Sequence, residues 1–380
     1  MKIGILTQPL KNNYGGLLQA YALQKVLKDM GHEVWIINRT LKERSFVRQY
    51  ASLGKRIILK YVLKKSTQPI FIFNPTKEEE KIVATYTNQF VLKHFPYITK
   101  EIVRNKDMIN LNGKGFDAYM VGSDQVWRPG YSPCITNYFL DFVETEKKIK
   151  RIAYAASFGV SNWEFTEEQA RDCSQLAKYF DAVSVREDSG IDLCRKYLGV
   201  DAVHVLDPTM LLNTKDYFHL LENEGKSTGN MMIYILDKTD EKQQMINDIS
   251  EKLNLLPFSV MPNKMLTKET RAEIEECIYP PVTKWLRGFI DAEFVITDSF
   301  HGCVFSILFN KPFIAIGNPK RGMSRFNSLL KLFELEDRLV NATETNYNNL
   351  FVEGINWTKV NAILMTKRKE ANLFLTKYLC

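Results

Sequence analysis

The chain has 380 residues, of which 45% are hydrophobic and 25% charged, and a formal net charge of +7. This composition is that of an ordinary soluble globular protein long enough for about two domains. The positive charge is spread along the chain, so it suits an anionic substrate or membrane surface, and without a recognised motif it gives no support to nucleic-acid binding.

The termini and the cysteines indicate a cytoplasmic protein. Because Met1 and Lys2 lead directly into an apolar run, we expect no signal peptide. No apolar run approaches the ~20 residues of a membrane helix. The six cysteines show neither CxxC pairing nor metal-ligand spacing. We therefore expect reduced thiols, no metal site and no cofactor.

The first elements of the chain predict a βαβ unit. A strand at Lys2–Thr7 leads into the turn Asn12–Gly16, a helix over Leu17–Met30 and a strand at Glu33–Asn38. The two glycines of the turn could let a ligand approach the backbone at the helix start, or could serve only the tight turn. They do not form the dinucleotide pattern GxGxxG.

A basic segment and a further helix come next. In Leu41–Lys65, lysines and Arg56 alternate with apolar residues. The part from Lys55 to Lys65 could rest on anionic lipid, although we favour a surface helix whose lysine stems cover apolar neighbours. The following helix is predicted over Lys77–His94.

Four more strands, separated mostly by helices, complete the first half of the chain. They are predicted at Phe116–Val121, Lys150–Ser157, Asp181–Val185 and Ala202–Leu206, with a helix at Thr166–Phe180. Six strands connected in this way indicate an α/β fold with a mainly parallel, doubly wound sheet. Such sheets bind ligands at the carboxyl ends of their strands.

Polar residues follow the strand Phe116–Val121 at this edge. Asp124 and Gln125 could orient sugar hydroxyls, and Trp127 could offer a stacking face. Alternatively, Ser123 and Asp124 cap a helix and Trp127 fills the core.

Arg186 follows the strand Asp181–Val185 at the same edge. Its planar, permanently charged guanidinium suits a carboxylate or phosphate. The alternative is an ordinary surface pair with Glu187 or Asp188.

The polar segment Asn213–Asn230 predicts a bridge to a second domain, where the pattern of strands and helices restarts. The predicted strands are Met231–Leu236, Phe258–Met261, Phe294–Thr297 and Phe313–Ile316, and the helices are Thr239–Leu253, Val282–Phe289 and Lys359–Leu379. We expect two Rossmann-like domains, residues 1–213 and 214–357, facing each other across a cleft, followed by a C-terminal helix over 358–380.

His301 is predicted at a turn between the strand Phe294–Thr297 and a helix over Gly302–Phe309. Asp298 and Ser299 are residue types that cap helices. An imidazole at this edge, close to a helix N-terminus, suits proton transfer beside a bound anion. It could equally cap the helix or pack beneath the turn.

Three cations follow the strand Phe313–Ile316 and would lie at the same edge as His301. They are Lys320, Arg321 and Arg325. They could clamp an anion, or belong to a solvated loop.

Five short motifs, in this order along the chain, resemble the polysaccharide pyruvyl transferase family. They are YGGLLQAYAL (Tyr14–Leu23), GSDQVW (Gly122–Trp127), SVREDSG (Ser184–Gly190), LDPTMLL (Leu206–Leu212) and TDSFHG (Thr297–Gly302). The resemblance implies a GT-B-like fold and transfer of pyruvate from phosphoenolpyruvate onto two hydroxyls of a sugar. The expected product is a cyclic ketal on a cell-surface glycan or its lipid-linked precursor.

The resemblance also suggests roles for individual residues. We expect His301 to exchange protons and Arg186 to hold the anionic end of the donor. Further donor contacts are predicted for Ser299, Gly302, Lys320, Arg321 and Arg325, and acceptor contacts for Asn13, Tyr14, Gly15, Gly16, Gln19, Asp124, Gln125 and Trp127. One departure is Ser299, since many family members have arginine two residues before the histidine. Arg321 and Arg325 could supply the missing cation.

Two other functions fit the same sequence. A glycosyltransferase on the same fold would use a nucleotide sugar as its donor. A non-catalytic relative would bind glycan or another biosynthetic protein. With a lipid-linked acceptor, the segment Lys55–Lys65 is the predicted contact with the inner face of the membrane.

Overall fold

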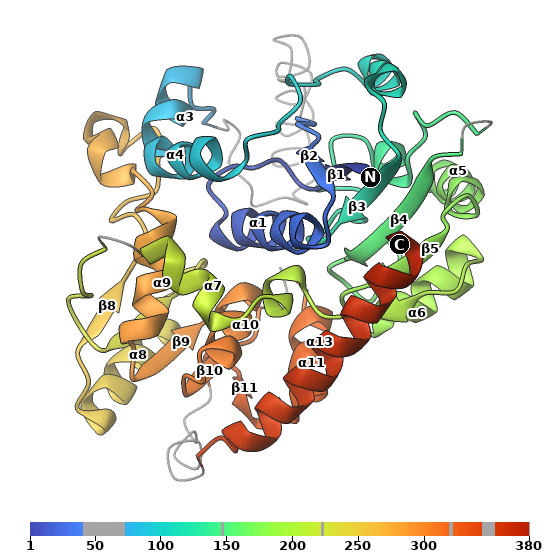
Figure 1. Cartoon of the computed structure of the whole chain (residues 1–380). Helices are drawn as coiled ribbons and strands as arrows, with labels where there is room; N and C mark the ends of the chain where they lie inside the picture. Colours follow the sequence, from blue (N-terminus) through green and yellow to red (C-terminus); the bar gives the residue numbers. More distant parts are fainter. Residues whose placement is uncertain (41–72, 146–147, 222–223, 319–321, 344–353, 380) are drawn as a thin grey trace, which may run out of the picture.

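The computed structural model describes residues 1–40, 73–145, 148–221, 224–318, 322–343 and 354–379. These residues form two parallel β-sheets with helices packed around them (Figure 1). The predicted α/β fold with two doubly wound sheets is therefore confirmed. The basic segment Leu41–Lys65 lies outside the described residues, as do Lys320 and Arg321.

The first sheet has six strands in the order β2-β1-β3-β4-β5-β6. Its elements are β1 (Lys2–Leu6), α1 (Tyr14–Asp29), β2 (Glu33–Ile36), α3 (Lys77–Val83), α4 (Thr85–His94), β3 (Ala118–Gly122), β4 (Lys150–Ala156), α5 (Glu167–Ala177), β5 (Ala182–Val185), α6 (Ser189–Leu193) and β6 (Val203–His204). β3 is buried along its whole length. Burial on both faces explains why the sequence of this strand is continuously apolar rather than alternating.

The second sheet has five strands in the order β11-β10-β9-β7-β8. Its elements are α7 (Thr214–Phe218), β7 (Met231–Tyr234), α8 (Asp240–Leu253), β8 (Pro257–Ser259), α9 (Val282–Asp291), β9 (Phe294–Thr297), α10 (Phe300–Leu308), β10 (Phe313–Ile316), α11 (Ser324–Phe333), β11 (Leu339–Val340) and α13 (Trp357–Leu379). The short strand β11 was not predicted.

Both sheets reverse their strand order after the first strand. In the first sheet β1 lies between β2 and β3, and in the second β7 lies between β8 and β9. Ligands of open α/β folds bind at such switch points, outside the carboxyl ends of the strands. The loops after β1 and β3 and the turn after β9 are therefore the places to look for a site.

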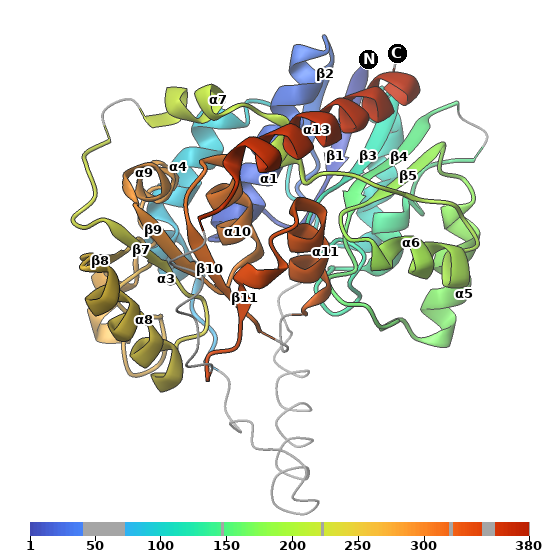
Figure 2. The same cartoon turned by 90° about the horizontal axis from the view of Figure 1, so that it is seen from below.

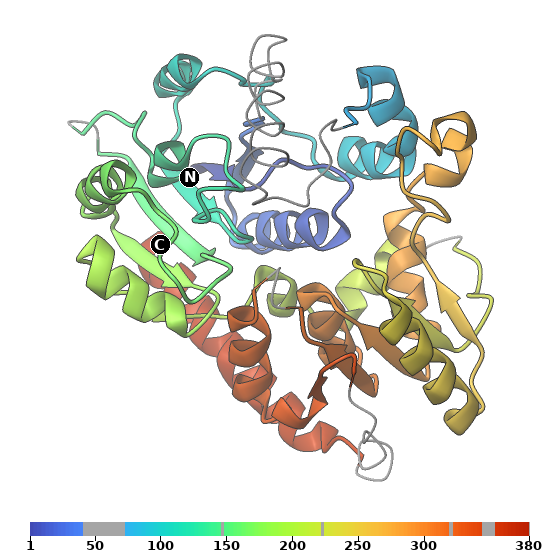
Figure 3. The ribbon, with the colours of Figure 1, turned by 180° about the vertical axis from the view of Figure 1, so that it is seen from behind.

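The α1 helix is buried between the two halves (Figures 1 and 3). Its Tyr14 ring stacks on Trp285 of α9, with 5.7 Å between the ring centroids, and its hydroxyl donates to the carbonyl of Pro280 at 2.8 Å. One hydrophobic core includes Leu17 and Leu18 of α1 together with residues of the second half. A helix covered on all sides needs apolar residues around its whole circumference, and the motif YGGLLQAYAL at the start of α1 is largely apolar.

Helix α13 returns from the second half to the first. Its Arg368 donates to the carbonyls of Met210 and Leu212 at 2.8 and 2.9 Å, and Lys150 of β4 donates to the carbonyl of Tyr378 at 2.8 Å. Figure 2 shows this helix running across the molecule to the first sheet. None of the helices in the described ranges has the length and apolar character needed to cross a membrane.

Several predicted helices differ from the observed ones in their bounds or their continuity. The helix predicted over Lys77–His94 is interrupted at Ala84, where the Thr85 hydroxyl bonds back to the carbonyl of Ile82 at 2.7 Å. Helix α1 begins at Tyr14 because the Asn13 side chain caps it, so the paired glycines lie within its first turn. Helix α10 begins at Phe300, so His301 is also in a first turn.

Candidate functional site

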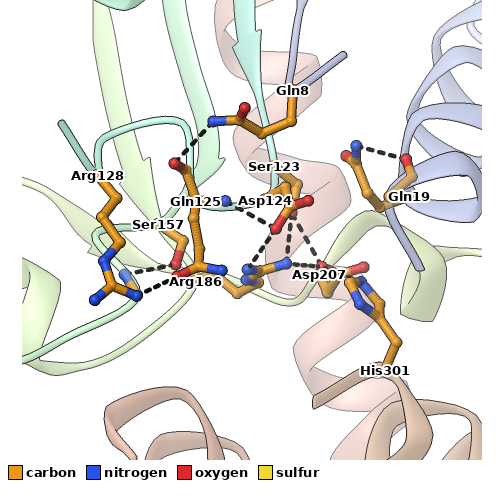
Figure 4. A network of polar contacts seen from close by, with 12 residues as sticks. Gln8, Gln19, Ser123, Asp124, Gln125, Arg128, Ser157, Arg186, Asp207 and His301 are labelled. Carbon is orange, nitrogen blue, oxygen red and sulfur yellow. Dashed lines mark hydrogen bonds and ion pairs between the residues drawn. The ribbon is translucent and has the colours of Figure 1, made fainter. Parts of the chain in front are cut away.

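A network of buried polar side chains lies where the strands of the first sheet end (Figure 4). Ser123 and Asp124 follow β3, Arg186 follows β5, and Asp207 follows β6. His301 reaches the same network from α10 of the second half. Parallel strands place these residues together because their carboxyl ends share one edge.

Asp207 is the common hydrogen-bond acceptor of this network. Its Oδ2 accepts from Arg186 Nη1 at 2.8 Å and from Ser123 Oγ at 3.0 Å. Its Oδ1 accepts from the backbone N–H and the hydroxyl of Thr209 at 3.0 and 2.7 Å. His301 Nε2 lies 3.6 Å from Oδ2. Both oxygens are thus surrounded by donors.

These contacts keep Asp207 ionised. Burial by itself raises the pKa of this carboxyl, but the neighbouring His301 imidazole and Arg186 guanidinium outweigh burial and hold its pKa well below the usual range. The site therefore has a fixed negative charge next to Arg186 and His301.

The Arg186 guanidinium is almost completely buried, yet several of its N–H groups are unused. Among the described residues, its Nε and Nη2 have no hydrogen-bond partner, and Nη2 lies 3.5 Å from Asp124 Oδ1. Buried charged donors without acceptors are costly, and an anion held here would accept from them. The backbone of Asp124 has a φ of 72°. This conformation is uncommon for residues other than glycine, and such residues cluster at functional sites.

His301 lies directly against the backbone of Gly15 in α1. A Cβ atom added to Gly15 would be 2.1 Å from His301 Nδ1 and 2.3 Å from its Cγ. The first glycine of the pair is therefore needed because any side chain would displace the imidazole. The second glycine, Gly16, donates its N–H to the Asn13 side chain at 3.1 Å. Gly302 has a comparable constraint, since a Cβ there would be 2.1 Å from Thr297 Oγ1.

Two guanidinium groups contact the ring of Phe300, the residue between Ser299 and His301. The guanidinium carbon of Arg186 lies 4.5 Å from the ring centroid, and that of Arg325 lies 5.8 Å from it. Burial and the charge of Arg186 lower the pKa of Arg325. Arg325 thus brings a buried positive charge to the ring of Phe300, which directly follows Ser299, the position at which the sequence lacks an arginine.

The predicted acceptor residues differ in their accessibility. Trp127 and Gln19 are buried, at 1% and 0% exposure, and Tyr14 is buried against Trp285. The Trp127 ring stacks on Phe139. Trp127 therefore fills the core, which was the alternative to a stacking face for the sugar. Of the remaining positions, Asn13 is exposed and Gln125 half-buried.

Gln125 is fixed from two sides. Its side-chain oxygen accepts from Arg128 Nη1 at 3.1 Å, and its backbone carbonyl accepts from Gln8 at 3.0 Å. Arg128 is itself held by Glu164, with its Nε 2.9 Å from the carboxylate. Ordered polar groups of this kind suit contacts with hydroxyls.

The switch point of the second sheet is occupied by the chain's own carboxylate. Asp298 accepts from the backbone N–H groups of Leu236 and Asp237 at 2.7 and 3.1 Å, and from Lys242 Nζ at 2.6 Å. Asp298 therefore does not cap α10; Ser299 is at the N-cap position, but its side chain makes no capping bond.

Asp207 and Phe300 were not predicted as site residues. Asp207 lies in the motif LDPTMLL and follows a predicted strand at the same edge as Arg186, and that position was a usable signal. The contact of Phe300 with Arg325 joins separate elements and leaves no local pattern. Within the described ranges, no three His, Cys, Asp or Glu side chains are grouped so that they could hold a metal ion.

Solved structures with little sequence identity are similar to this chain. UGT89C1 of Arabidopsis thaliana, in complex with UDP-L-rhamnose, matches with a TM-score of 0.51 and 8% identity, over 98% of this chain and 97% of that chain. UDP-GlcNAc 2-epimerase from Neisseria meningitidis, bound to UDP-GlcNAc, matches with a TM-score of 0.46 and 11% identity, over 100% and 99%. At this identity the first match shows the fold alone, which is GT-B-like.

No curated protein matches the sequence significantly. The family model described as polysaccharide pyruvyl transferase matches residues 13–320. This range includes the paired glycines, Arg186, Asp207 and His301, and it covers most of the chain. The protein therefore belongs to the polysaccharide pyruvyl transferase family.

Proposed function

We propose that the protein transfers pyruvate from phosphoenolpyruvate onto two hydroxyls of a sugar, within a cell-surface polysaccharide or its lipid-linked precursor. The observation that carries the proposal is the buried Arg186 guanidinium, whose unused donors lie beside the pair formed by Asp207 and His301. This arrangement offers a fixed cation for an anionic donor next to a group that can exchange protons.

The reaction needs both functions. The enol carbon C3 gains a proton, and C2 bonds to the first sugar oxygen. The second sugar oxygen then bonds to C2 as the bond from C2 to the phosphate oxygen breaks. Overall, the two sugar hydroxyls lose two protons. One of them balances the proton gained by C3, and the other goes to the departing phosphate or to solvent. His301 is our candidate for moving these protons.

Donor and acceptor would approach from different elements. Arg186 and Arg325 supply the positive charge for the donor's carboxylate and phosphate, where positioned cations contribute several kcal/mol. Asn13, Asp124 and Gln125 are our candidates for the acceptor. We propose that residues 1–213 and 214–357 form the two domains and residues 358–380 the C-terminal helix. The donor would bind mainly to the second domain, and Arg186 of the first domain would contribute to its binding.

A nucleotide-sugar donor is the main alternative, and one contact argues against it. The backbone N–H groups at the second switch point are already bonded to Asp298, which is paired with Lys242. A diphosphate at that position would have to displace a buried carboxylate of its own sign. A non-catalytic role is less compatible with the unused buried donors of Arg186, which binding of a neutral glycan does not require.

Thermal shift and phosphate release test the proposal directly. The purified chain is incubated with phosphoenolpyruvate and a panel of free and lipid-linked sugars, in parallel with a panel of nucleotide sugars. We expect stabilisation by phosphoenolpyruvate and acceptor-dependent phosphate release, both absent with nucleotide sugars. His301→Ala should abolish the release, whereas His219→Ala, at an exposed position, should not.

The alternative outcomes are equally informative. Stabilisation by a nucleotide sugar, without a response to phosphoenolpyruvate, would replace the proposal with glycosyl transfer. If glycan alone stabilised the protein and no phosphate appeared, the binding role would be preferred.

A further inference from the structure

Asp207 connects the two halves of the site. The carboxylate belongs to the loop after β6, and it contacts Arg186 from the end of β5 and His301 from α10 in the other half. Its side chain is completely buried, so these contacts are shielded from water. Electrostatic interactions are stronger under such conditions than at a surface.

We propose that Asp207 is a positioning residue, which holds the Nε2 edge of His301 and the Nη1 edge of Arg186 in place and so leaves the Nε and Nη2 donors of Arg186 for the substrate. This inference deepens the proposed function and rests on it for its kinetic consequence. Asp207 itself transfers no proton in this scheme.

The geometry constrains His301 from two sides. Its Nε2 lies 3.6 Å from Asp207 Oδ2, and its Nδ1 edge is against Gly15 of α1. The ring therefore has little freedom to rotate without a clash at Gly15 or loss of the carboxylate. A separation of 3.6 Å is longer than a hydrogen bond, and contacts between catalytic groups often shorten when substrate binds.

Asparagine cannot replace Asp207 in this environment. Each carboxylate oxygen accepts from at least two donors, Oδ1 from Thr209 and Oδ2 from Arg186 and Ser123. An Asn side chain has one acceptor oxygen and must turn its NH₂ group toward one of these sets of donors. Asp207→Asn therefore preserves volume while removing the charge and one of the two acceptors.

Proton NMR of ¹⁵N-histidine-labelled protein tests the contact itself. A ring N–H that donates to a buried carboxylate resonates downfield and exchanges slowly with water. We expect such a signal, correlated with Nε2, in the wild type with phosphoenolpyruvate bound. His301→Gln assigns it among the five histidines of the chain. Asp207→Asn should remove the signal or shift it upfield.

A matched control separates this effect from a general loss of stability. Asp291 also pairs with an arginine, with 3.0 Å between its carboxylate and Arg287 Nε, and accepts a backbone N–H. It lies at the end of α9 before β9, whereas His301 follows β9. Asp291→Asn should leave the His301 signal in place.

Kinetics provide the second measurement. With an active acceptor, Asp207→Asn should lower kcat by about 100-fold or more, comparable to the loss when a carboxylate that orients a catalytic histidine is removed. The KM for phosphoenolpyruvate should rise by less than about tenfold, because Arg186 keeps its charge.

The two proposals fail in different ways. Absence of a protected Nε2 signal in the wild type, or its persistence in Asp207→Asn, would overturn the positioning role, whatever the activity. The wild-type spectrum decides this even if the variant does not fold. A protected signal that depends on Asp207, in a protein without pyruvyl transfer, would support the positioning of His301 and refute the proposed reaction.

Discussion

At the scale of single residues, the site depends on groups that cannot be exchanged for similar ones. Gly15 is the clearest case, because its missing side chain makes room for the His301 imidazole. Arg325 is another, because it places a buried cation against the ring of Phe300, the residue before His301. Each leads to a substitution with a defined consequence.

Gly15→Ala should impair activity by displacing His301. The added Cβ would lie 2.1 Å from Nδ1, and overpacking of this kind costs about 1–3 kcal/mol in the free energy of unfolding. We expect more than a tenfold loss of phosphate release. The control is Gly113→Ala, where a Cβ would meet nothing within 4 Å. Phosphate release within twofold of the wild type would show that the contact is unimportant.

Arg325→Gln should weaken donor binding. Removal of a buried cation next to the donor site should raise the apparent dissociation constant for phosphoenolpyruvate about tenfold or more, measured by the ligand-induced thermal shift. Arg195→Gln is the control. The Arg195 side chain is 69% exposed, and its ion pair with Asp201 is long, with 3.9 Å between Nε and the carboxylate. Unchanged donor affinity in a folded Arg325→Gln protein would remove Arg325 from the donor site.

At the scale of elements, α4 carries a histidine whose burial makes stability depend on pH. The His94 ring contacts the rings of Phe90 and Tyr21, with 4.5 and 5.5 Å between centroids. Burial, followed by the charge of Lys93, lowers the pKa of His94 to about 4. The folded state therefore disfavours the protonated ring.

Stability should accordingly fall as the pH is lowered from about 6.5 to about 4, because the unfolded chain then binds a proton that the folded chain does not. The contribution of His94 should be about 1–2 kcal/mol over this range. Urea unfolding at a series of pH values measures it. His94→Phe retains the ring packing and should reduce this dependence; an unchanged pH profile would assign the dependence to other groups.

At the scale of the whole molecule, α13 helps to hold the two halves together. Arg368 donates to two carbonyls and to the Asn213 side chain, all in the segment that leads out of the first half. Since His301 and Asp207 come from different halves, this connection also stabilises the position of these two side chains relative to each other.

Arg368→Met should destabilise the protein by about 1–3 kcal/mol, because it leaves carbonyl groups without their charged donor. Hydrogen exchange should accelerate along α13, and urea unfolding should report the lost stability. The neighbouring Lys369 is exposed, and Lys369→Met should change stability by less than about 0.5 kcal/mol. Equal effects of the two substitutions would argue against a specific role for Arg368.

The fold class and most of the elements could be predicted from local sequence patterns alone. Apolar runs such as Phe294–Thr297 and Phe313–Ile316 were predicted as strands and are β9 and β10. These runs are readable because burial on both faces of a parallel strand demands local, continuous apolarity. The motifs around the paired glycines and His301 likewise indicated the family that the family model matches.

How these motifs meet depends on the tertiary structure. The contact of Gly15 with His301 and the shared acceptor Asp207 each join residues far apart in the chain. A local pattern records which face of an element is apolar, but it does not record which side chain of another element lies against that face. The docking of two sheets through α1 sets those contacts, and with them the geometry of the site.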